Sequence, residues 1–145
     1  MKNGELRDFP INVKIKLSAL WASVMFLYVY GDFFTLFLPG RIQNLMNGQS
    51  GVGATTPTQL LIFAILMTLP SLMIFLSVTL RPGINRWLNI ILGAFYSAVM
   101  ILIGWMSIDP WRIYYVYLAA VEVILTLMIV GYAWSWERAN GESQS

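Results

Sequence analysis

Four long runs of apolar residues dominate the sequence. They occupy positions 17–38, 59–80, 87–108 and 113–135, and each has the length of about 20 residues that a helix needs to cross the hydrocarbon core of a bilayer. Polar and apolar residues do not alternate along these runs, as they would in the strands of a membrane barrel. The pattern therefore predicts an all-α membrane protein, built as an antiparallel bundle of four transmembrane helices.

Short polar segments separate the runs and carry helix-boundary signals. Thr56 is followed by Pro57, which is the pattern of a helix cap with proline at the first helical position. Asp109 and Pro110 repeat this pattern before the last run. Pro82 ends the second run, so we expect the third helix to begin within a few residues. The second, third and fourth helices should therefore be joined by tight hairpins.

The longest connection, residues 39–56, contains a shorter apolar pattern. Ile42, Leu45 and Met46 are spaced i, i+3 and i+4, and Gly48 can end a helical turn. We therefore expect a short helix at the outer membrane interface, followed by a glycine-rich flexible linker over residues 48–54. The helix could form a lid over the bundle, or it could be a connector whose apolar residues rest on lipid.

Composition agrees with a membrane location and removes several kinds of chemistry. The chain is 58% hydrophobic and 11% charged, whereas soluble domains have about 25% charged residues. It has no cysteine and no histidine, which excludes disulfides and cysteine nucleophiles and removes the usual zinc, haem and Ser–His–Asp sites. We expect no metal and no cofactor. The nine basic residues are too scattered to indicate a nucleic-acid partner.

The basic residues are divided unevenly between the two ends of the predicted bundle. If both termini are cytoplasmic, seven lysines and arginines lie on that side and two, Arg41 and Arg112, lie on the other. This asymmetry predicts cytoplasmic segments 1–16 and 137–145 on either side of a membrane domain at 17–136. Indole rings prefer the headgroup layer, and the tryptophans fall near the ends of the runs, at Trp21, Trp87, Trp105, Trp111, Trp134 and Trp136.

Two acidic residues lie inside the apolar runs, Asp32 in the first and Glu122 in the fourth. An ionisable group at the bilayer centre costs about 2.5–3.5 kcal/mol on insertion scales, so each should face protein or water rather than lipid. At about 1.5 Å per residue, both acids fall slightly outward of the membrane centre and at similar depth. We therefore expect two buried acids in one polar pocket that opens toward the outer half.

Other polar residues fall at the same depth as the two acids. Tyr28 precedes Asp32 by one turn on the same helix face, and Tyr115 shares the face of Glu122. The third run should turn Asn89, Gly93 and Ser97 inward. The predicted ligand-binding or proton-binding residues are Asp32, Glu122, Tyr28, Tyr96, Ser97 and Tyr115.

Pro70 lies at the middle of the second run, between Thr68 and Ser71, and we expect those two hydroxyls to face the bundle interior. Because proline has no N–H, it frees the Leu66 carbonyl and favours a kink. In lipid the freed acceptor needs a donor, which a neighbouring hydroxyl could supply.

Three interpretations of the two acids remain open. The carboxyls can be structural, donating to a tyrosine, serine or carbonyl to fix helix register. They can bind a proton, a cation or the polar head of an amphipathic ligand, because two nearby carboxylates resist joint ionisation and can share one proton. They can also perform general acid–base catalysis on a lipid-soluble substrate, although the pattern singles out no catalytic residue.

The sequence favours ligand binding or proton exchange over catalysis. The alternative function is that of an accessory or scaffolding subunit of a larger membrane complex. Beyond the lipid bilayer, the expected partners are a small amphipathic ligand, a second copy in a homo-oligomer, or that larger complex. The two acids lie in the first and fourth runs rather than in matching helices, which weakens the case for an inverted-repeat transporter.

Four short motifs follow one another along the chain: Leu27 to Asp32, Leu69 with Pro70, Asn85 to Asn89, and Tyr114 to Glu122. In this order they resemble a family of small bacterial four-helix membrane proteins with no assigned function. The likeness spans most of residues 17–136. It implies a multi-pass protein of the bacterial inner membrane and no particular activity. A looser likeness to DoxX-like proteins rests on the four-helix topology and the paired tyrosines that begin at Tyr114.

Overall fold

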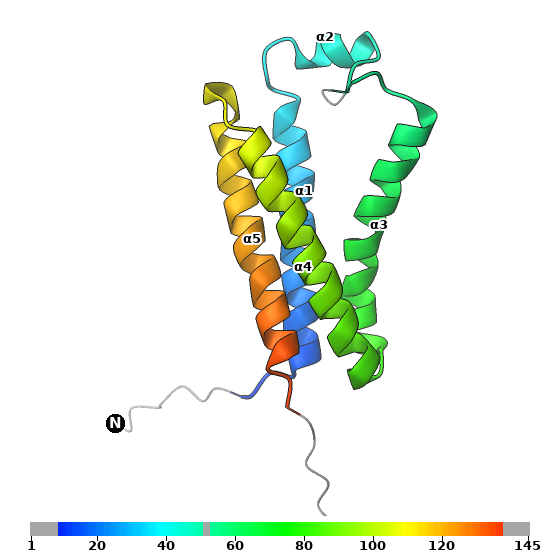
Figure 1. Cartoon of the computed structure of the whole chain (residues 1–145), viewed down its shortest axis with the longest axis vertical. Helices are drawn as coiled ribbons and strands as arrows, with labels where there is room; N and C mark the ends of the chain where they lie inside the picture. Colours follow the sequence, from blue (N-terminus) through cyan, green and yellow to red (C-terminus); the bar gives the residue numbers. More distant parts are fainter. Residues whose placement is uncertain (1–8, 51–52, 138–145) are drawn as a thin grey trace, which may run out of the picture.

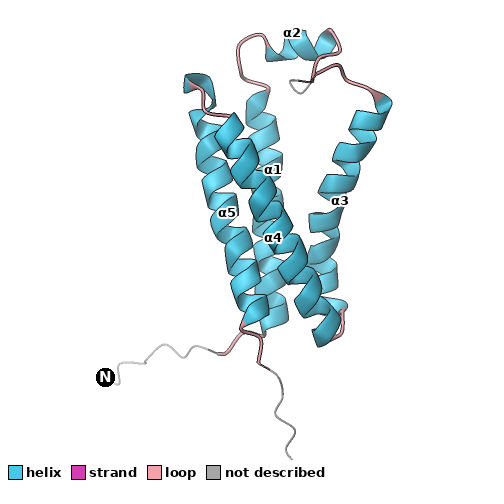
Figure 2. Cartoon of the chain, viewed as in Figure 1, coloured by secondary structure: helices cyan, strands magenta, loops and turns pink. Residues whose placement is uncertain are grey.

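The computed structural model of the chain describes residues 9–50 and 53–137 (Figure 1). Its long helices are α1 (Val13–Thr35), α3 (Pro57–Thr79), α4 (Pro82–Met106) and α5 (Ile113–Trp134), with the short segments α2 (Arg41–Met46) and η1 (Pro110–Arg112) in the connections. Within the described ranges the remaining residues form loops, with one isolated bridge between Gln49 and Ala54 (Figure 2).

The prediction of an all-α bundle with four candidate membrane spans is confirmed. Each long helix is long and apolar enough to cross a membrane. We call the end of the bundle where α1 begins and α5 ends the terminal end, and the end that carries α2 and η1 the loop end (Figure 1). The first and last described residues lie together at the terminal end. Each span therefore runs opposite to the one before it.

The helices do not pack equally well along their lengths. α4 packs along α5, while α1 lies against both α5 and α3. α3 is the loosest member: its buried residues are Pro70, Met73 and Ser77, all in its second half. Its first half, residues 57–69, leans away from α1 and α4 toward the loop end (Figure 1). The bundle is therefore tight at the terminal end and open at the loop end.

The expectation that Thr68 and Ser71 face the interior is wrong, since both are exposed. Their hydroxyls donate to carbonyls one turn earlier in α3, Thr68 to Ala64 at 2.7 Å and Ser71 to Met67 at 2.8 Å. A helix can satisfy these hydroxyls by itself, so they need not face a neighbouring helix.

The boundary signals in the sequence are found at the helix ends. The Thr56 hydroxyl accepts the Gln59 N–H at 3.2 Å, and the Asp109 carboxyl accepts the Trp111 N–H at 2.9 Å. α4 starts at Pro82 itself, five residues before the predicted run. Proline fits the first helical position, where its missing N–H would have no intrahelical partner.

The predicted short helix in the long connection is present as α2. Gly40 and Gly48 flank it with φ of 73° and 72°, a left-handed conformation that glycine adopts without steric cost. Beyond α2 the predicted linker closes on itself, because the Ser50 N–H donates to the Gly53 carbonyl at 2.9 Å. Residues 51 and 52, which fell within that linker, lie outside the described residues.

Two basic side chains close the terminal end. The Lys14 ammonium donates to the Leu80 carbonyl at 2.6 Å, just beyond α3, and the Arg86 guanidinium donates to the Trp134 carbonyl at 3.0 Å, at the end of α5. The last carbonyls of a helix lack intrahelical donors and carry partial negative charge, so these bonds stabilise both ends. Lys2, Arg7 and Arg138, which contributed to the predicted charge asymmetry, lie outside the described residues.

Candidate functional site

A hydrogen-bonded polar network joins α1, α3 and α4 near the terminal end. Its members are Trp21, Ser77, Asn85 and Asn89, and all four have 0% exposure. The Asn89 side-chain oxygen accepts from the Trp21 indole at 2.7 Å and from the Ser77 hydroxyl at 3.4 Å. Its amide donates to the Asn85 carbonyl and side-chain oxygen at 2.8 and 2.7 Å. We call these four residues the paired network.

The sequence indicated only part of this network. Asn89, Gly93 and Ser97 are buried, as their shared helix face predicted. Trp21, however, lies in the core rather than among the headgroups, because its N–H has a partner in Asn89. The spacing of Asn85 and Asn89, four residues apart on one face, was the available signal for a polar contact.

A second set of buried polar groups lies closer to the loop end and has no such partners. Glu122 is 4% exposed and Tyr28 is 5% exposed. The Tyr28 hydroxyl is buried without a hydrogen-bond partner. Within the described part of the chain, the Glu122 carboxyl makes no hydrogen bond, and its backbone carbonyl accepts from Thr126 at 2.8 Å. An unpaired buried polar group costs about 1–3 kcal/mol, so two together call for an explanation.

Asp32 completes this set, which we call the unpaired cluster: Tyr28, Asp32 and Glu122. The carboxyl groups of Asp32 and Glu122 are close enough to interact electrostatically, and so are Glu122 and the Tyr28 hydroxyl. Tyr115 is half-buried and is also close enough to both acids to interact with them electrostatically. Thus three of the other five predicted site residues lie around Glu122.

The expectation of two buried acids is wrong for Asp32, which is exposed. Asp32 lies on the same face of α1 as Ser18 and Met25, because the three residues are seven positions apart. This face of α1 is turned toward α3. The Ser18 hydroxyl donates to the Ile74 carbonyl of α3 at 2.7 Å. At the level of Asp32, however, α3 has turned away (Figure 1). Asp32 therefore lies on a part of α1 that α3 no longer covers. Of the two acids, only Glu122 is enclosed by the bundle.

Tyr96 has a structural partner of its own. Its hydroxyl donates to the Leu66 carbonyl, the acceptor that Pro70 leaves free one turn later. The hypothesis of a neighbouring hydroxyl donor is therefore confirmed, with Tyr96 as that donor. Its ring lies between those of Trp21 and Tyr28, at centroid distances of 6.0 and 6.3 Å. Tyr96 thus ties α4 to α3 at the level where α3 begins to diverge.

Ser97 likewise makes a contact between helices rather than lining an open site. Its hydroxyl lies 2.6 Å from that of Thr126 on α5. The neighbouring Gly93 permits this approach, because a Cβ there would lie 2.8 Å from Val130 and 3.2 Å from the Thr126 carbonyl. Ser97 and Gly93 together hold α4 against α5, one turn below Glu122.

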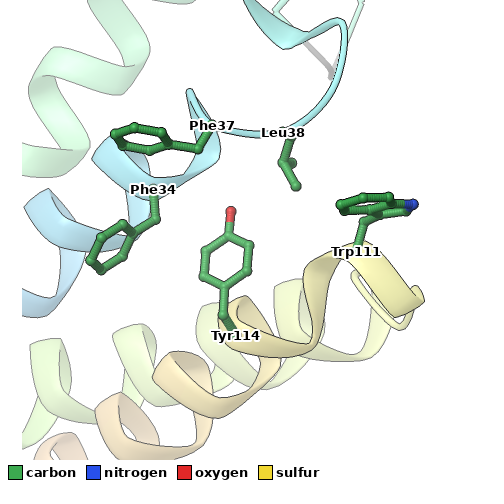
Figure 3. Close-up of a pocket in the computed structure, with 5 residues that line it drawn as sticks. All are labelled: Phe34, Phe37, Leu38, Trp111 and Tyr114. Atoms are coloured by element: carbon green, nitrogen blue, oxygen red, sulfur yellow. The ribbon is translucent and has the colours of Figure 1, made fainter.

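A separate cavity of about 480 Å³ lies at the loop end, between the end of α1 and the start of α5. Its walls are almost entirely apolar (Figure 3), formed by Phe34, Phe37, Leu38, Trp111 and Tyr114. The one hydroxyl among them, that of Tyr114, already shares a hydrogen bond of 3.0 Å with Thr35. This cavity includes none of the predicted site residues, and its one hydroxyl already has a partner.

Residues 6–143 match the DUF6326 family, which is described as a family of unknown function. The chain belongs to this family. The match covers nearly the whole length of the chain and agrees with the resemblance to an uncharacterised four-helix family. Comparison with curated proteins and with solved structures gave no match. The likeness to DoxX-like proteins therefore has no support from these comparisons.

The unpaired cluster offers a limited set of chemical groups. Two carboxyls and a phenol can accept hydrogen bonds from an ammonium group or hold a proton. The residues that the structure describes contain no group of three or more acidic, cysteine or histidine side chains that could hold a metal ion. The arrangement is therefore suited to binding a cationic group or exchanging a proton.

Proposed function

We propose that the unpaired cluster binds the cationic head of a small amphipathic ligand and holds a proton when that ligand is absent. The observation that carries this proposal concerns two groups close enough to interact electrostatically: the Tyr28 hydroxyl, which is buried without a partner, and the carboxyl of the buried Glu122, for which the described structure shows no hydrogen bond. An ammonium group would satisfy both acceptors at once. Asp32 adds a second negative charge nearby, which favours a cation over an anion.

We further propose that the protein lies in a bacterial inner membrane with both termini in the cytoplasm. The described basic residues support this orientation, because four of them, Lys14, Lys16, Arg81 and Arg86, lie near the terminal end and two, Arg41 and Arg112, lie near the loop end. Lysine and arginine are enriched on the cytoplasmic side. The loop end, with its open side next to Asp32, would then face outward.

Binding of a simple amphipathic amine tests the proposed function. We expect dodecylamine to raise the melting temperature of the purified protein in mild detergent, whereas dodecanol, with the same tail and no charge, should not. Glu122→Gln keeps the size of the side chain and removes its negative charge, so it should abolish the shift. Glu137→Gln, at an exposed position outside the cluster, is the matched control and should behave like the wild type.

Two results would contradict the proposal. One is a dodecanol shift as large as that of dodecylamine, which would indicate only tail binding. The other is an unchanged dodecylamine shift in Glu122→Gln.

An accessory subunit is the second candidate function, and the first half of α3 favours it. Leu60, Leu61 and Ile65 are each more than half exposed, so this segment offers a helix surface that the rest of the described chain leaves uncovered. Native mass measurement after mild-detergent extraction separates the two functions. A different protein recovered in fixed stoichiometry would favour the subunit, whereas a monomer or homodimer favours the ligand site.

A further inference from the structure

A positive charge lies at the loop end, outward of the two acids. Arg41 is the first residue of α2, which runs across the loop end of the bundle (Figure 1). Its guanidinium donates to the Ser50 carbonyl, while its Nε is buried without a partner. Arg41 and Asp32 are close enough to interact electrostatically. The polar groups are therefore ordered by depth, with Arg41 outermost, Asp32 next and Glu122 enclosed.

We infer that the ligand of the unpaired cluster is a zwitterionic lipid with a primary amine, an aminophospholipid, whose phosphate binds Arg41 and whose ammonium binds Asp32 and Glu122. This inference rests on the proposed function and names the class of ligand. A purely cationic head would leave the unpaired Arg41 Nε without an acceptor, and a purely anionic head would meet the two carboxyls unfavourably. A head with both charges in this order complements all three side chains.

The unpaired acceptors select a primary amine over a quaternary one. The Tyr28 hydroxyl is buried without a partner and the described structure shows no donor to the Glu122 carboxyl, whereas an ammonium group supplies three N–H bonds in a compact space. A trimethylammonium group has no N–H and is bound instead by the faces of several aromatic rings. Phosphatidylethanolamine therefore fits the cluster, and phosphatidylcholine does not.

The surroundings of Asp32 favour a lipid over a free headgroup. On α1, Phe26, Val29 and Phe33 are each at least half exposed, and the first half of α3 is similarly apolar. Acyl chains can stay in contact with these side chains while the head reaches Asp32. Asp32 precedes the end of α1 by three residues, so the ammonium must enter only about 5 Å below the helix end.

The test is a lipid titration followed by native mass spectrometry of the full chain in mild detergent. Phosphatidylethanolamine, phosphatidylcholine and phosphatidylglycerol with identical acyl chains are compared. Because each charge-assisted hydrogen bond contributes about 1.5–3 kcal/mol, we expect phosphatidylethanolamine to bind about tenfold more tightly than either of the others. Equal binding of the three lipids would overturn the inference.

Variants assign this preference to individual side chains. Arg41→Gln should weaken phosphatidylethanolamine binding about tenfold, whereas Arg112→Gln, an exposed arginine at the same end, should not. Asp32→Asn should remove the preference over phosphatidylglycerol, and Asp32→Glu, which keeps the charge, should retain it. If Arg41→Gln and Arg112→Gln weakened phosphatidylethanolamine binding equally, general surface charge would explain the effect, and the inference would be contradicted.

Two further outcomes separate this inference from the proposed function. If dodecylamine binding depends on Glu122 but the three lipids bind alike, the lipid assignment fails and the proposed function stands. If neither dodecylamine nor any lipid depends on Glu122, both fail. Free phosphoethanolamine is added as a competitor. Displacement at concentrations similar to those of the lipid would overturn the lipid assignment in favour of a soluble zwitterion.

Discussion

The paired network and the unpaired cluster are two polar layers in the same bundle, joined through the neighbouring rings of Trp21, Tyr96 and Tyr28. In the paired network, amides, an indole and a hydroxyl bind one another across three helices. In the unpaired cluster, Tyr28 and Glu122 are similarly buried, yet neither the Tyr28 hydroxyl nor the Glu122 carboxyl has a hydrogen-bond partner in the described chain. Burial alone therefore does not distinguish the two layers, whereas hydrogen-bond pairing does.

The two layers also differ in how firmly α3 is held. At the paired network, Ser77 and Asn85 bind α3 to α4 through the bond from the Asn85 amide to the Ser77 carbonyl, at 2.6 Å. Toward the unpaired cluster, α3 has no buried residue before Pro70. Thus α3 is held by hydrogen bonds at the paired network, whereas the half of it that lies toward the unpaired cluster buries no residue.

The largest effect on stability should come from the paired network. Asn89→Leu keeps a similar volume but leaves the Trp21 indole and the Asn85 side-chain oxygen unpaired. With three or four hydrogen bonds lost, at about 0.6–1.7 kcal/mol each in membrane proteins, the free energy of unfolding should fall by about 2–4 kcal/mol. Unfolding by SDS in mixed micelles measures this change. Thr79→Val, whose exposed hydroxyl bonds only to its own helix, is the control. A loss no greater than in that control would refute the structural role of the network.

Gly93→Ala should have the next largest effect, because Gly93 holds α4 against α5 between the two layers. The new methyl group would lie 2.8 Å from Val130 and 3.2 Å from the Thr126 carbonyl. Overpacking of this kind costs about 1–3 kcal/mol. The matched control is Gly131→Ala, on α5, where nothing lies within 4 Å. That variant should be neutral or slightly stabilising, and equal losses in both would contradict the close packing at Gly93.

Tyr96→Phe should have a moderate effect on stability and a clearer effect on α3. It removes the donor for the Leu66 carbonyl, at a cost of about 1 kcal/mol. The first half of α3 should then be less well held. Since the chain has no cysteine, spin labels on Tyr30→Cys and Ile62→Cys report the distance between α1 and α3. The distribution should broaden in Tyr96→Phe, and an unchanged distribution would contradict the proposed link.

The smallest effects should come from the unpaired cluster itself. Tyr28→Phe and Glu122→Gln remove groups that make no hydrogen bond in the described structure. Each should change the free energy of unfolding by less than about 1 kcal/mol, in either direction. The same SDS titration tests this expectation. A loss as large as that of Asn89→Leu would remove the difference between the two layers.

Hydrophobic pattern and boundary residues were sufficient to predict the helices, their number and the caps at Thr56 and Asp109. The chemistry of Pro70 also predicted a hydroxyl donor for Leu66. These features depend on local sequence. The exposure of Asp32 and the burial of Trp21 depend instead on how α3 packs against α1, which one-dimensional periodicity does not encode. For the same reason, counting residues along each predicted helix placed Tyr28 and Glu122 at similar depth. It did not show that both side chains would lack hydrogen-bond partners.

The central claim is that the buried Glu122 carboxyl is kept unpaired for a proton or a cation rather than for the fold. Difference infrared spectroscopy tests it most directly, by following the carboxyl band between about pH 5 and 9, with and without dodecylamine. The account predicts a band that changes with pH, responds to the amine, disappears in Glu122→Gln and persists in Glu137→Gln. A Glu122 band that responds to neither pH nor the amine would contradict it.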